Sequence, residues 1–259
     1  MRMRFKLAPP QLSETHLWQL HLPTATVDLA LCESWLSPIE RDRAQRLVRS
    51  AARHQFIVSR AGLRYLLSAY LGCPPTAVQF DYGAYGRPQL SHPCADLQFN
   101  LAHSGSWVVY GVGHCQWLGV DVEQLAPRPR LEALIRRCLN SVEQATLPPV
   151  PTERLERFVQ YWTVKEAHLK AVGLGLSYPM TAVQVRLQPT PQLVRPVQAA
   201  EVTTTQWQTQ LWCPDATAIA AVCVGQPTRF VRRDWLGWPD ADEFGWSRPH
   251  IQYDQPVNR

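Results

Sequence analysis

Two carboxylates stand one residue apart in the segment 117–125, WLGVDVEQL, where Asp121 and Glu123 alternate with Val120 and Val122. Alternation of apolar and polar residues predicts a strand, and side chains two residues apart point to the same side of a strand. We therefore expect both carboxylates on one face and both valines in the core. Carboxylates arranged in this way suit Mg²⁺ or Mn²⁺. From spacing alone, two exposed acids at a sheet edge are the commoner explanation.

A second group of ionisable residues lies in the segment 152–172, whose apolar residues recur at helical spacing. Glu166 follows Trp162 by four positions and precedes Lys170 by four, so the three side chains share one face of the predicted helix. Lys165 stands beside them. An exposed Glu–Lys pair of this spacing contributes only about 0.3–0.5 kcal/mol and is the default explanation for it.

Other residues permit other chemistry. Arg43, Arg46 and Arg87 are able to bind phosphate through charge-assisted hydrogen bonds, although a solvated surface explains each arginine taken singly. His103 and Ser104 permit a hydrolase with an acidic partner. That alternative is weak because neighbouring side chains rarely face each other and no G-x-S-x-G motif is present.

The elements that would hold these residues follow an α+β order, with mainly antiparallel pairing, rather than a regular βαβ alternation. A capping box at Ser37 and Glu40 begins a region of two consecutive helices that runs to about Leu71. From Gln226 onward we expect an irregular tail. The other predicted elements are strands at 16–22, 107–113, 182–187, 206–212 and 217–224 and a helix at 131–139.

The composition limits the class of protein. The chain has 259 residues and a net charge of +5, which favours anionic partners without choosing between phosphates, acidic proteins and nucleic acid. Seven cysteines without a C-x-x-C pair argue against a disulfide framework and a zinc site. No apolar run reaches the length of a signal peptide or a membrane span, so we expect a soluble, cytoplasmic protein. Nucleic-acid binding through the arginine-rich helices is a minor alternative.

Four segments in a fixed order carry a family resemblance. They are YGRP at 85–88, FNLAHSG at 99–105, GVDVE at 119–123 and WTVKEAHLK at 162–170. Together they resemble the phosphopantetheinyl transferases, in the longer, Sfp-like branch with broad specificity. The resemblance covers residues 16 to 225, and it is the pair formed by the last two segments that makes it specific.

The resemblance implies two similar α+β halves, at 1–117 and 118–225, related by pseudo-twofold symmetry, with coenzyme A bound between them. The residues at 226–259 would form the tail. The implied reaction moves the phosphopantetheine arm of coenzyme A to a serine of an acyl or peptidyl carrier protein. Such carriers serve fatty acid, polyketide and nonribosomal peptide synthesis. A monomer would suffice, and neither nucleic acid nor membrane is an expected partner.

The resemblance also implies roles for individual residues. Asp121, Glu123 and Glu166 would hold Mg²⁺, with Mn²⁺ as an alternative. Glu166 would be the general base, and Lys170 would stabilise the leaving 3′,5′-ADP. The residues expected to bind the coenzyme are Arg43, Arg46, Arg87, Ala102, His103, Lys165 and Lys170.

The chain departs from the common family pattern at several positions. Ala102 stands where serine is frequent, Arg87 where lysine is frequent, Thr163 where serine is frequent, and Glu40 at a position that is basic in some relatives. These differences concern coenzyme contacts rather than the three carboxylates. The alternative function is a catalytically inactive module that binds coenzyme A or a carrier protein.

Overall fold

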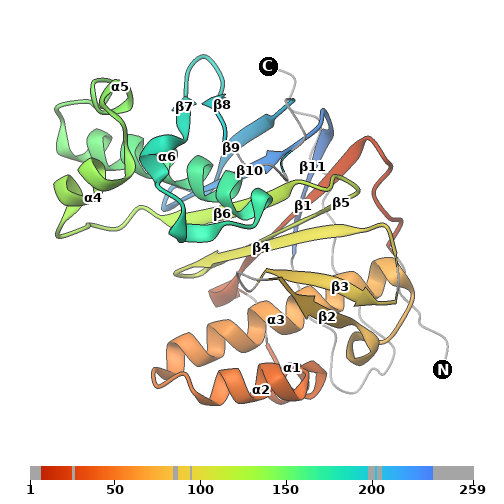
Figure 1. Ribbon diagram of the computed structural model, residues 1–259. Helices are drawn as coiled ribbons and strands as arrows, with labels where there is room; N and C mark the ends of the chain where they lie inside the picture. The colour runs from red at the N-terminus through yellow and green to blue at the C-terminus, as the bar shows by residue number, and fades with distance from the viewer. Residues whose placement is uncertain are drawn as a thin grey trace.

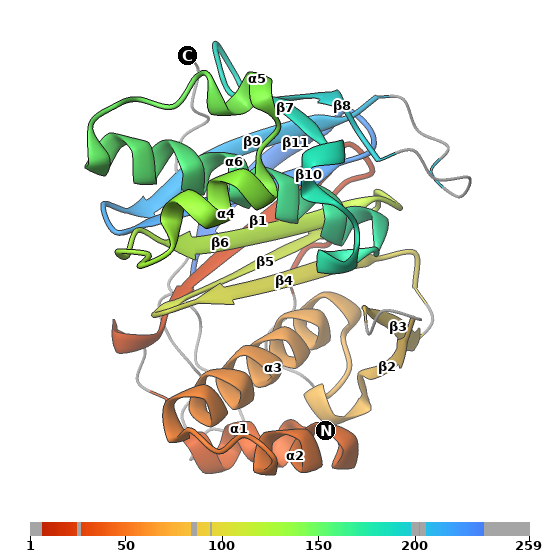
Figure 2. The same cartoon turned by 60° about the vertical axis from the view of Figure 1, so that its left-hand side comes forward.

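The computed structural model describes residues 7–24, 27–83, 87–93, 95–197, 202 and 206–235, and it is built from two halves with the same order of elements (Figures 1 and 2). The first half contains β1 (Glu14–His21), α1 (Leu29–Trp35), α2 (Pro38–Gln45), α3 (Ser50–Leu71), β2 (Gln79–Tyr82), β3 (Pro88–His92), β4 (Gln98–Ser104) and β5 (Trp107–Gly113). The second contains β6 (Leu118–Gln124), α4 (Leu131–Cys138), α5 (Ser141–Gln144), α6 (Pro151–Val172), β7 (Gln184–Arg186), β8 (Gln192–Arg195), β9 (Gln208–Asp215) and β10 (Ala218–Val224). Short 3₁₀ turns lie at Leu22–Thr24, Pro75–Ala77, Gly175–Ser177 and Met180–Ala182.

The two main sheets repeat the same pairing. In the first half β5 lies between β1 and β4, and in the second half β10 lies between β6 and β9, with every one of these pairs antiparallel. In each half the first strand pairs with the last, which in turn pairs with the one before it. The repeat confirms the predicted α+β fold of two similar halves. It also supports a boundary between residues 117 and 118, which remains a prediction.

The core has three layers of apolar contact because successive side chains of each strand point to opposite faces of its sheet. One face of β5 packs on α3, and one face of β10 packs on α6. The opposite faces of the two sheets meet each other in a third cluster, which includes Val109, Val120 and Val222. The order of layers is therefore helix, sheet, sheet, helix, with α3 and α6 covering the outer faces of the two sheets and α1 and α2 lying beyond α3 (Figure 2).

Local sequence accounts for the helix boundaries that the site depends on. Ser37 and Glu40 form the predicted capping box at the start of α2. Helix α3 ends at Gly72 and α6 ends at Gly173, both with positive φ, where glycine is favoured. Helix α6 starts with Pro151 in its first turn and has no side-chain cap. The short helix α1 is an element that the sequence analysis does not predict.

The structure corrects the prediction of an irregular tail. Strand β11 (Arg229–Asp234) pairs in parallel with β1 and extends the first-half sheet. Trp235, which follows it, is buried against Trp18, Tyr65 and Tyr110. Charged residues at four of the six strand positions hid this strand from hydrophobic patterning, because its pairing uses the backbone. The rest of the predicted tail, from residue 236, lies outside the described residues.

Two further features of the described residues concern the cysteines and the hydrophobicity of the helices. The six cysteines among them are free thiols, and Cys94 lies outside the described part. No described helix has both the length and the apolar character needed to cross a bilayer.

Replacing Trp235 with alanine should destabilise the protein strongly, because the ring fills space in the first-half core. A buried tryptophan truncated to alanine costs about 3–5 kcal/mol, measurable as the free energy of unfolding in urea. Leu12→Ala is the control, since Leu12 is 74% exposed and should change this free energy very little. A loss of less than 1 kcal/mol in Trp235→Ala would mean, on the same scale, that the ring adds little to the core.

Candidate active site

Strand β6 directs its polar face at helix α6. Gly119, Asp121 and Glu123 lie on this face, while the alternate residues of β6 lie in the core between the sheets. A Cβ atom at Gly119 would come within 2.0 Å of the carbonyl oxygen of Ala167, so only glycine allows the helix to approach this closely. The approach brings the carboxylates of the strand to the polar residues of the helix.

The helix supplies partners to both carboxylates. Lys170 Nζ donates to Asp121 Oδ1 at 2.5 Å, and Trp162 Nε1 donates to Glu123 Oε1 at 3.1 Å. The other oxygen of Glu123 accepts from Arg128 Nη2 at 2.8 Å and from Ser104 Oγ at 3.3 Å. Residues that sequence spacing placed on one strand face and one helix face are thus brought into contact.

Burial and mutual repulsion make the carboxylates less acidic. Loss of water contact raises the pKa of Asp121 to about 6, with Lys170 opposing the rise and Glu123 adding to it. The pKa of Glu166 is raised to about 7, first by loss of water contact and then by the negative charges of Asp121 and Glu123, with Lys170 opposing the rise. The three carboxylates therefore act on one another, as a cation site requires.

The donor set fits a divalent cation. Asp121 Oδ2 and Glu166 Oε1 are buried and have no hydrogen-bond partner among the residues that the structure describes. A hard cation such as Mg²⁺ or Mn²⁺ would satisfy such oxygens and relieve the repulsion between them. The described residues hold no ready-made group of three metal-binding side chains. The contacts of Glu123 give a reason, because its two oxygens are turned to Trp162, Ser104 and Arg128.

A basic pocket of about 260 Å³ lies beside the carboxylates, between the halves. Lys170 comes from α6 of the second half, and the rest of the lining comes from the first half. The residues that line it include Arg60, Pro88, Asn100, Ala102, His103 and Lys170. Three of the residues predicted to bind the coenzyme, Ala102, His103 and Lys170, therefore share one pocket.

The surroundings of His103 show that this pocket is positively charged. Its side chain keeps an exposed side, while the surrounding protein shields the rest of the ring. Its pKa is lowered first by this loss of water contact and then by the positive charges of Lys170, Arg60 and Arg43. Cations from three helices thus act at one histidine, and the neutral ring remains available as a hydrogen-bond donor to an anion.

The other predicted arginines behave differently from one another. Arg43 is exposed and lies over the ring of Phe56, 5.4 Å from its centroid. Arg46 is exposed and pairs with Asp42 at 2.6 Å. Neither lines the basic pocket.

Arg87 joins the two halves. Its guanidinium donates to the carbonyl oxygens of Ala171 at 2.5 Å and of Leu118 at 3.2 Å. Burial lowers its pKa. The structure thus places Arg87 between the halves, whereas the first residues of its motif, Tyr85 and Gly86, lie outside the described residues.

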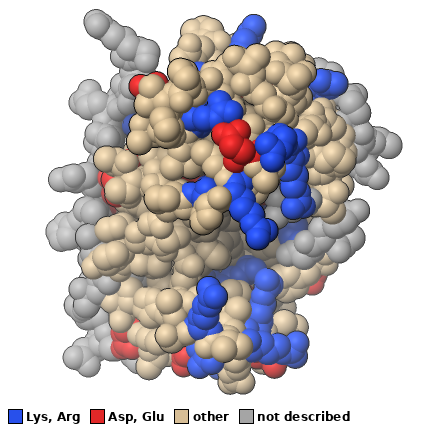
Figure 3. Space-filling view, turned by 90° about the vertical axis from the view of Figure 1, so that its left-hand side faces the viewer, with Lys and Arg blue, Asp and Glu red and all other residues tan. Residues whose placement is uncertain are grey.

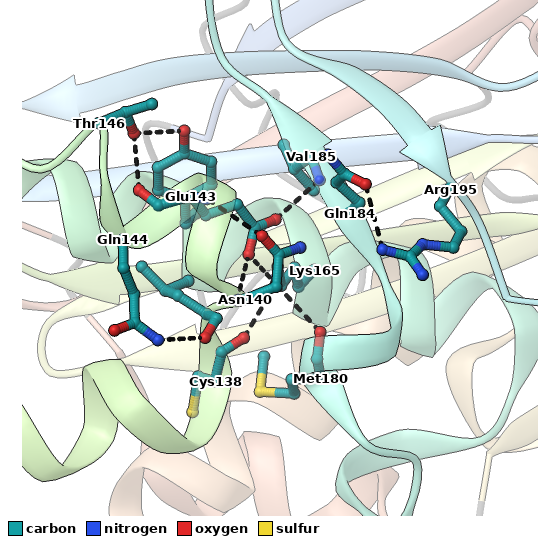
Figure 4. A network of polar contacts seen from close by, with 12 residues as sticks. Cys138, Asn140, Glu143, Gln144, Thr146, Lys165, Met180, Gln184, Val185 and Arg195 are labelled. Carbon is teal, nitrogen blue, oxygen red and sulfur yellow. Dashed lines mark hydrogen bonds and ion pairs between the residues drawn. The ribbon is translucent and has the colours of Figure 1, made fainter.

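The structure corrects the prediction that Lys165 contacts the coenzyme. Lys165 is fully buried, and Figure 4 shows its ammonium group at the centre of a polar network. It donates to Glu143 Oε2 at 2.6 Å and to the carbonyl oxygens of Cys138 and Met180. Glu143 also accepts from the backbone N–H of Val185. Lys165 therefore ties α4, α5 and the segment before β7 to α6, on the side of the helix away from the basic pocket.

A second pocket, of about 370 Å³, lies on the far side of Trp162. Leu134, Tyr178 and Met180 line it together with the Trp162 ring. Because Trp162 Nε1 also donates to Glu123, this residue borders both the more apolar pocket and one of the carboxylates.

Sequence reasoning did not single out Arg60. The residue lies in a run of α3 that is otherwise almost wholly buried and apolar, from Ile57 to Leu67. A charged residue within such a run was the available indication, since charged side chains are rarely buried without a partner.

Comparison with known proteins agrees with this arrangement. The family model described as 4'-phosphopantetheinyl transferase superfamily matches residues 118–223, and the model described as 4'-phosphopantetheinyl transferase, N-terminal, matches residues 22–114. The chain is 34% identical over 223 residues to 4'-phosphopantetheinyl transferase HetI of a Nostoc species, covering 83% of this chain and 91% of the relative.

Two further relatives are more distant. The chain is 28% identical over 155 residues to 4'-phosphopantetheinyl transferase Sfp of Bacillus subtilis, which covers 60% of this chain and 67% of the relative. The holo-[acyl-carrier-protein] synthase structure from Thermotoga maritima has a TM-score of 0.36 and 22% identity, and covers 55% of this chain and 86% of that one.

Replacing Lys165 with methionine should destabilise the fold, because it leaves the Glu143 carboxylate buried without its partner. Breaking a buried ion pair in this way costs about 3–5 kcal/mol, measurable by urea denaturation. The double variant Glu143→Gln, Lys165→Met should lose less than the single one, because no uncompensated charge remains. Equal losses in the two variants would contradict this role of the pair.

Proposed function

The chain belongs to the 4'-phosphopantetheinyl transferase superfamily, and we propose that it transfers the phosphopantetheine arm of coenzyme A to a serine of an acyl or peptidyl carrier protein. The observation that carries the proposal is the hydrogen bond from Lys170, which lines the basic pocket, to Asp121, one of two carboxylates whose charges act on Glu166. Phosphoryl transfer needs both the carboxylates and the basic pocket, because charge on the phosphate must be neutralised while the nucleophile loses a proton.

Each residue of the cluster has a role in this reaction. Asp121, Glu123 and Glu166 would hold Mg²⁺, which supplies charge neutralisation at the pyrophosphate when bound. Glu166 takes the proton of the carrier serine, whose hydroxyl is otherwise a poor nucleophile. The serine oxygen bonds to the phosphorus that carries the pantetheine arm, and the bond from that phosphorus to 3′,5′-ADP breaks. Lys170 neutralises the charge that develops on the leaving group.

The two pockets suit the two ends of the coenzyme. The basic pocket takes the nucleotide phosphates, with His103 and the backbone at Ala102 as donors. The more apolar pocket beyond Trp162 takes the uncharged arm. Arg43 lies near enough to act electrostatically on His103, and we assign it to the same phosphates. We assign Arg46 a weaker electrostatic contribution at the same phosphates. We assign Arg87 the role of fixing the two halves around the site.

We further propose that the enzyme acts as a monomer in the cytoplasm. One chain supplies both sides of the basic pocket, so no second copy is needed to complete the site. Static light scattering of the active sample should give the mass of one chain.

Incubation of an apo carrier protein with this protein, coenzyme A and Mg²⁺ should add the mass of one phosphopantetheine arm, read by intact mass spectrometry. Glu166→Gln and Asp121→Ala should reduce the rate by 100-fold or more while the thermal unfolding transition persists. Glu156→Gln is the matched control, because Glu156 is an exposed carboxylate on the same helix. Unchanged rates in both site variants would contradict the assigned roles. Coenzyme binding without transfer to fatty acid, polyketide or peptide carriers would favour the inactive binding module.

Removal of divalent cations should stop transfer. Addition of a chelator is expected to abolish the mass increase, and excess Mg²⁺ should restore it, because the carboxylates repel one another and the substrate without a cation. Mn²⁺ in place of Mg²⁺ tests the alternative ion. Full activity in chelator would show that the carboxylates act without a metal.

A further inference from the structure

We propose that Arg128 serves as the counter-ion of Glu123 while the metal site is empty, and that a divalent cation displaces it. Arg128 in this way lowers the affinity of the site for its metal. The inference rests on the proposed function for the assignment of Glu123 as a metal ligand. It concerns a residue that lies outside all four family segments.

Both side-chain oxygens of Glu123 accept hydrogen bonds from other side chains. Oε1 accepts from Trp162 Nε1 at 3.1 Å, and Oε2 accepts from Arg128 Nη2 at 2.8 Å and from Ser104 Oγ at 3.3 Å. Of these three donors only Arg128 carries a positive charge. A guanidinium and a divalent cation at the same carboxylate repel each other, so the two compete for Glu123.

The other two carboxylates remain open on one side. Asp121 and Glu166 are 4% and 6% exposed, and each keeps one buried oxygen without a hydrogen-bond partner among the described residues. The negative charge of Glu123 already acts on Glu166. A cation held by the two open oxygens would therefore also attract Glu123, and would draw it away from Arg128.

Of the three donors, Arg128 is the one best able to leave. Ser104 is held by a second bond, because its Oγ also accepts from the backbone N–H of Gln124 at 3.2 Å. The ring of Trp162 packs on Phe158, with 5.9 Å between the ring centroids. Arg128 has a side chain that is 25% exposed, and its Nε atom is buried without a partner in the described part of the chain. It thus contacts the carboxylate through one nitrogen and not through the stronger pair of parallel bonds.

The backbone around Arg128 limits the exchange to its side chain. Pro127 and Pro129 flank the residue, and each proline ring fixes its own φ angle. The carbonyl oxygen of Arg128 accepts from the backbone N–H of Leu131 at 3.0 Å, which ties the loop to the start of α4. We therefore expect rotation of the Arg128 side chain toward solvent, with the loop between β6 and α4 left in place.

Positive charge on the surrounding surface has to be separated from the specific contact. Figure 3 shows Lys and Arg side chains gathered on the side of the molecule that is at the left of Figure 1, where α4 lies and acidic side chains are few. Loss of any positive charge on this side would favour cation binding slightly. The experiment therefore needs a control that removes such a charge without touching Glu123.

The test measures the binding of Mn²⁺ to the metal-free protein without coenzyme, with electron paramagnetic resonance reporting the free ion. Arg128→Met should bind Mn²⁺ about 3- to 10-fold more tightly than the unmodified protein, as expected from the loss of a partly exposed, charged hydrogen bond. Mg²⁺ should compete for the same site in both proteins. Saturating Mn²⁺ should also raise the thermal unfolding temperature more in Arg128→Met, because tighter binding stabilises the folded state more.

Two controls separate displacement from a general effect of charge. Arg130→Met removes the same charge from an exposed arginine two residues further along, and should leave the affinity within about twofold of the unmodified protein. Glu123→Gln should weaken Mn²⁺ binding, and adding Arg128→Met to it should no longer tighten binding, because the contact is already lost.

Several results would overturn the inference. Unchanged or weaker binding of Mn²⁺ in Arg128→Met would mean that the guanidinium does not compete with the cation. Equal tightening in Arg130→Met, or tightening that persists in the Glu123→Gln background, would assign the effect to surface charge. No binding of Mn²⁺ by either the unmodified protein or Arg128→Met would leave nothing to displace Arg128.

The two proposals fail separately. A protein whose Arg128→Met variant binds Mn²⁺ more tightly but which never modifies a carrier would leave this inference standing and refute the transferase. A protein that modifies carriers, but binds Mn²⁺ equally with and without the Arg128 side chain, would refute this inference alone.

Discussion

The close approach of the two halves at β4 and β6 is the constraint on which the site depends. These strands belong to different sheets and share no ladder of backbone hydrogen bonds. Side chains join them instead: Asn100 Oδ1 accepts from the backbone N–H of Val120, and Ser104 Oγ accepts from that of Gln124. Arg87 adds two hydrogen bonds from the first half to carbonyls of the second. The basic pocket lies at this junction, where Arg60 of α3 and Lys170 of α6 line it from the two halves.

The junction also explains how opposite charges are distributed. The carboxylates come from the second half, on β6 and α6, and the Arg60 guanidinium that lines the basic pocket comes from α3 of the first half. Lys170 stands where the two sets meet and opposes the rise in the pKa of both Asp121 and Glu166. Neither half alone combines a cation site with the whole lining of the basic pocket. A duplicated fold has in this way produced a site whose two sides are chemically different.

Spacing predicted those parts of the site that depend on local geometry. Alternation placed Asp121 and Glu123 on one side of a strand, and a four-residue interval placed Glu166 and Lys170 on one side of a helix. The same interval rule cannot tell which neighbour is buried, so Lys165 was assigned to the coenzyme although it lies on the opposite, wholly buried side. Arg60 was missed because sequence patterning does not report which of several arginines on one helix lines a pocket between the halves.

Strand β11 has a consequence for how the chain is made. The first-half sheet has β1 as one of its strands, yet it gains β11 and the Trp235 ring only after the whole second half has been synthesised. Proteins with several domains generally fold from the N-terminus as each unit leaves the ribosome. Here the nascent first half would emerge with the edge of β1 unpaired and an aromatic core lacking one ring, a state prone to pair with other strands. The two halves, although alike in topology, are therefore completed together rather than in turn, because the first sheet receives its last strand from residues that follow the second half.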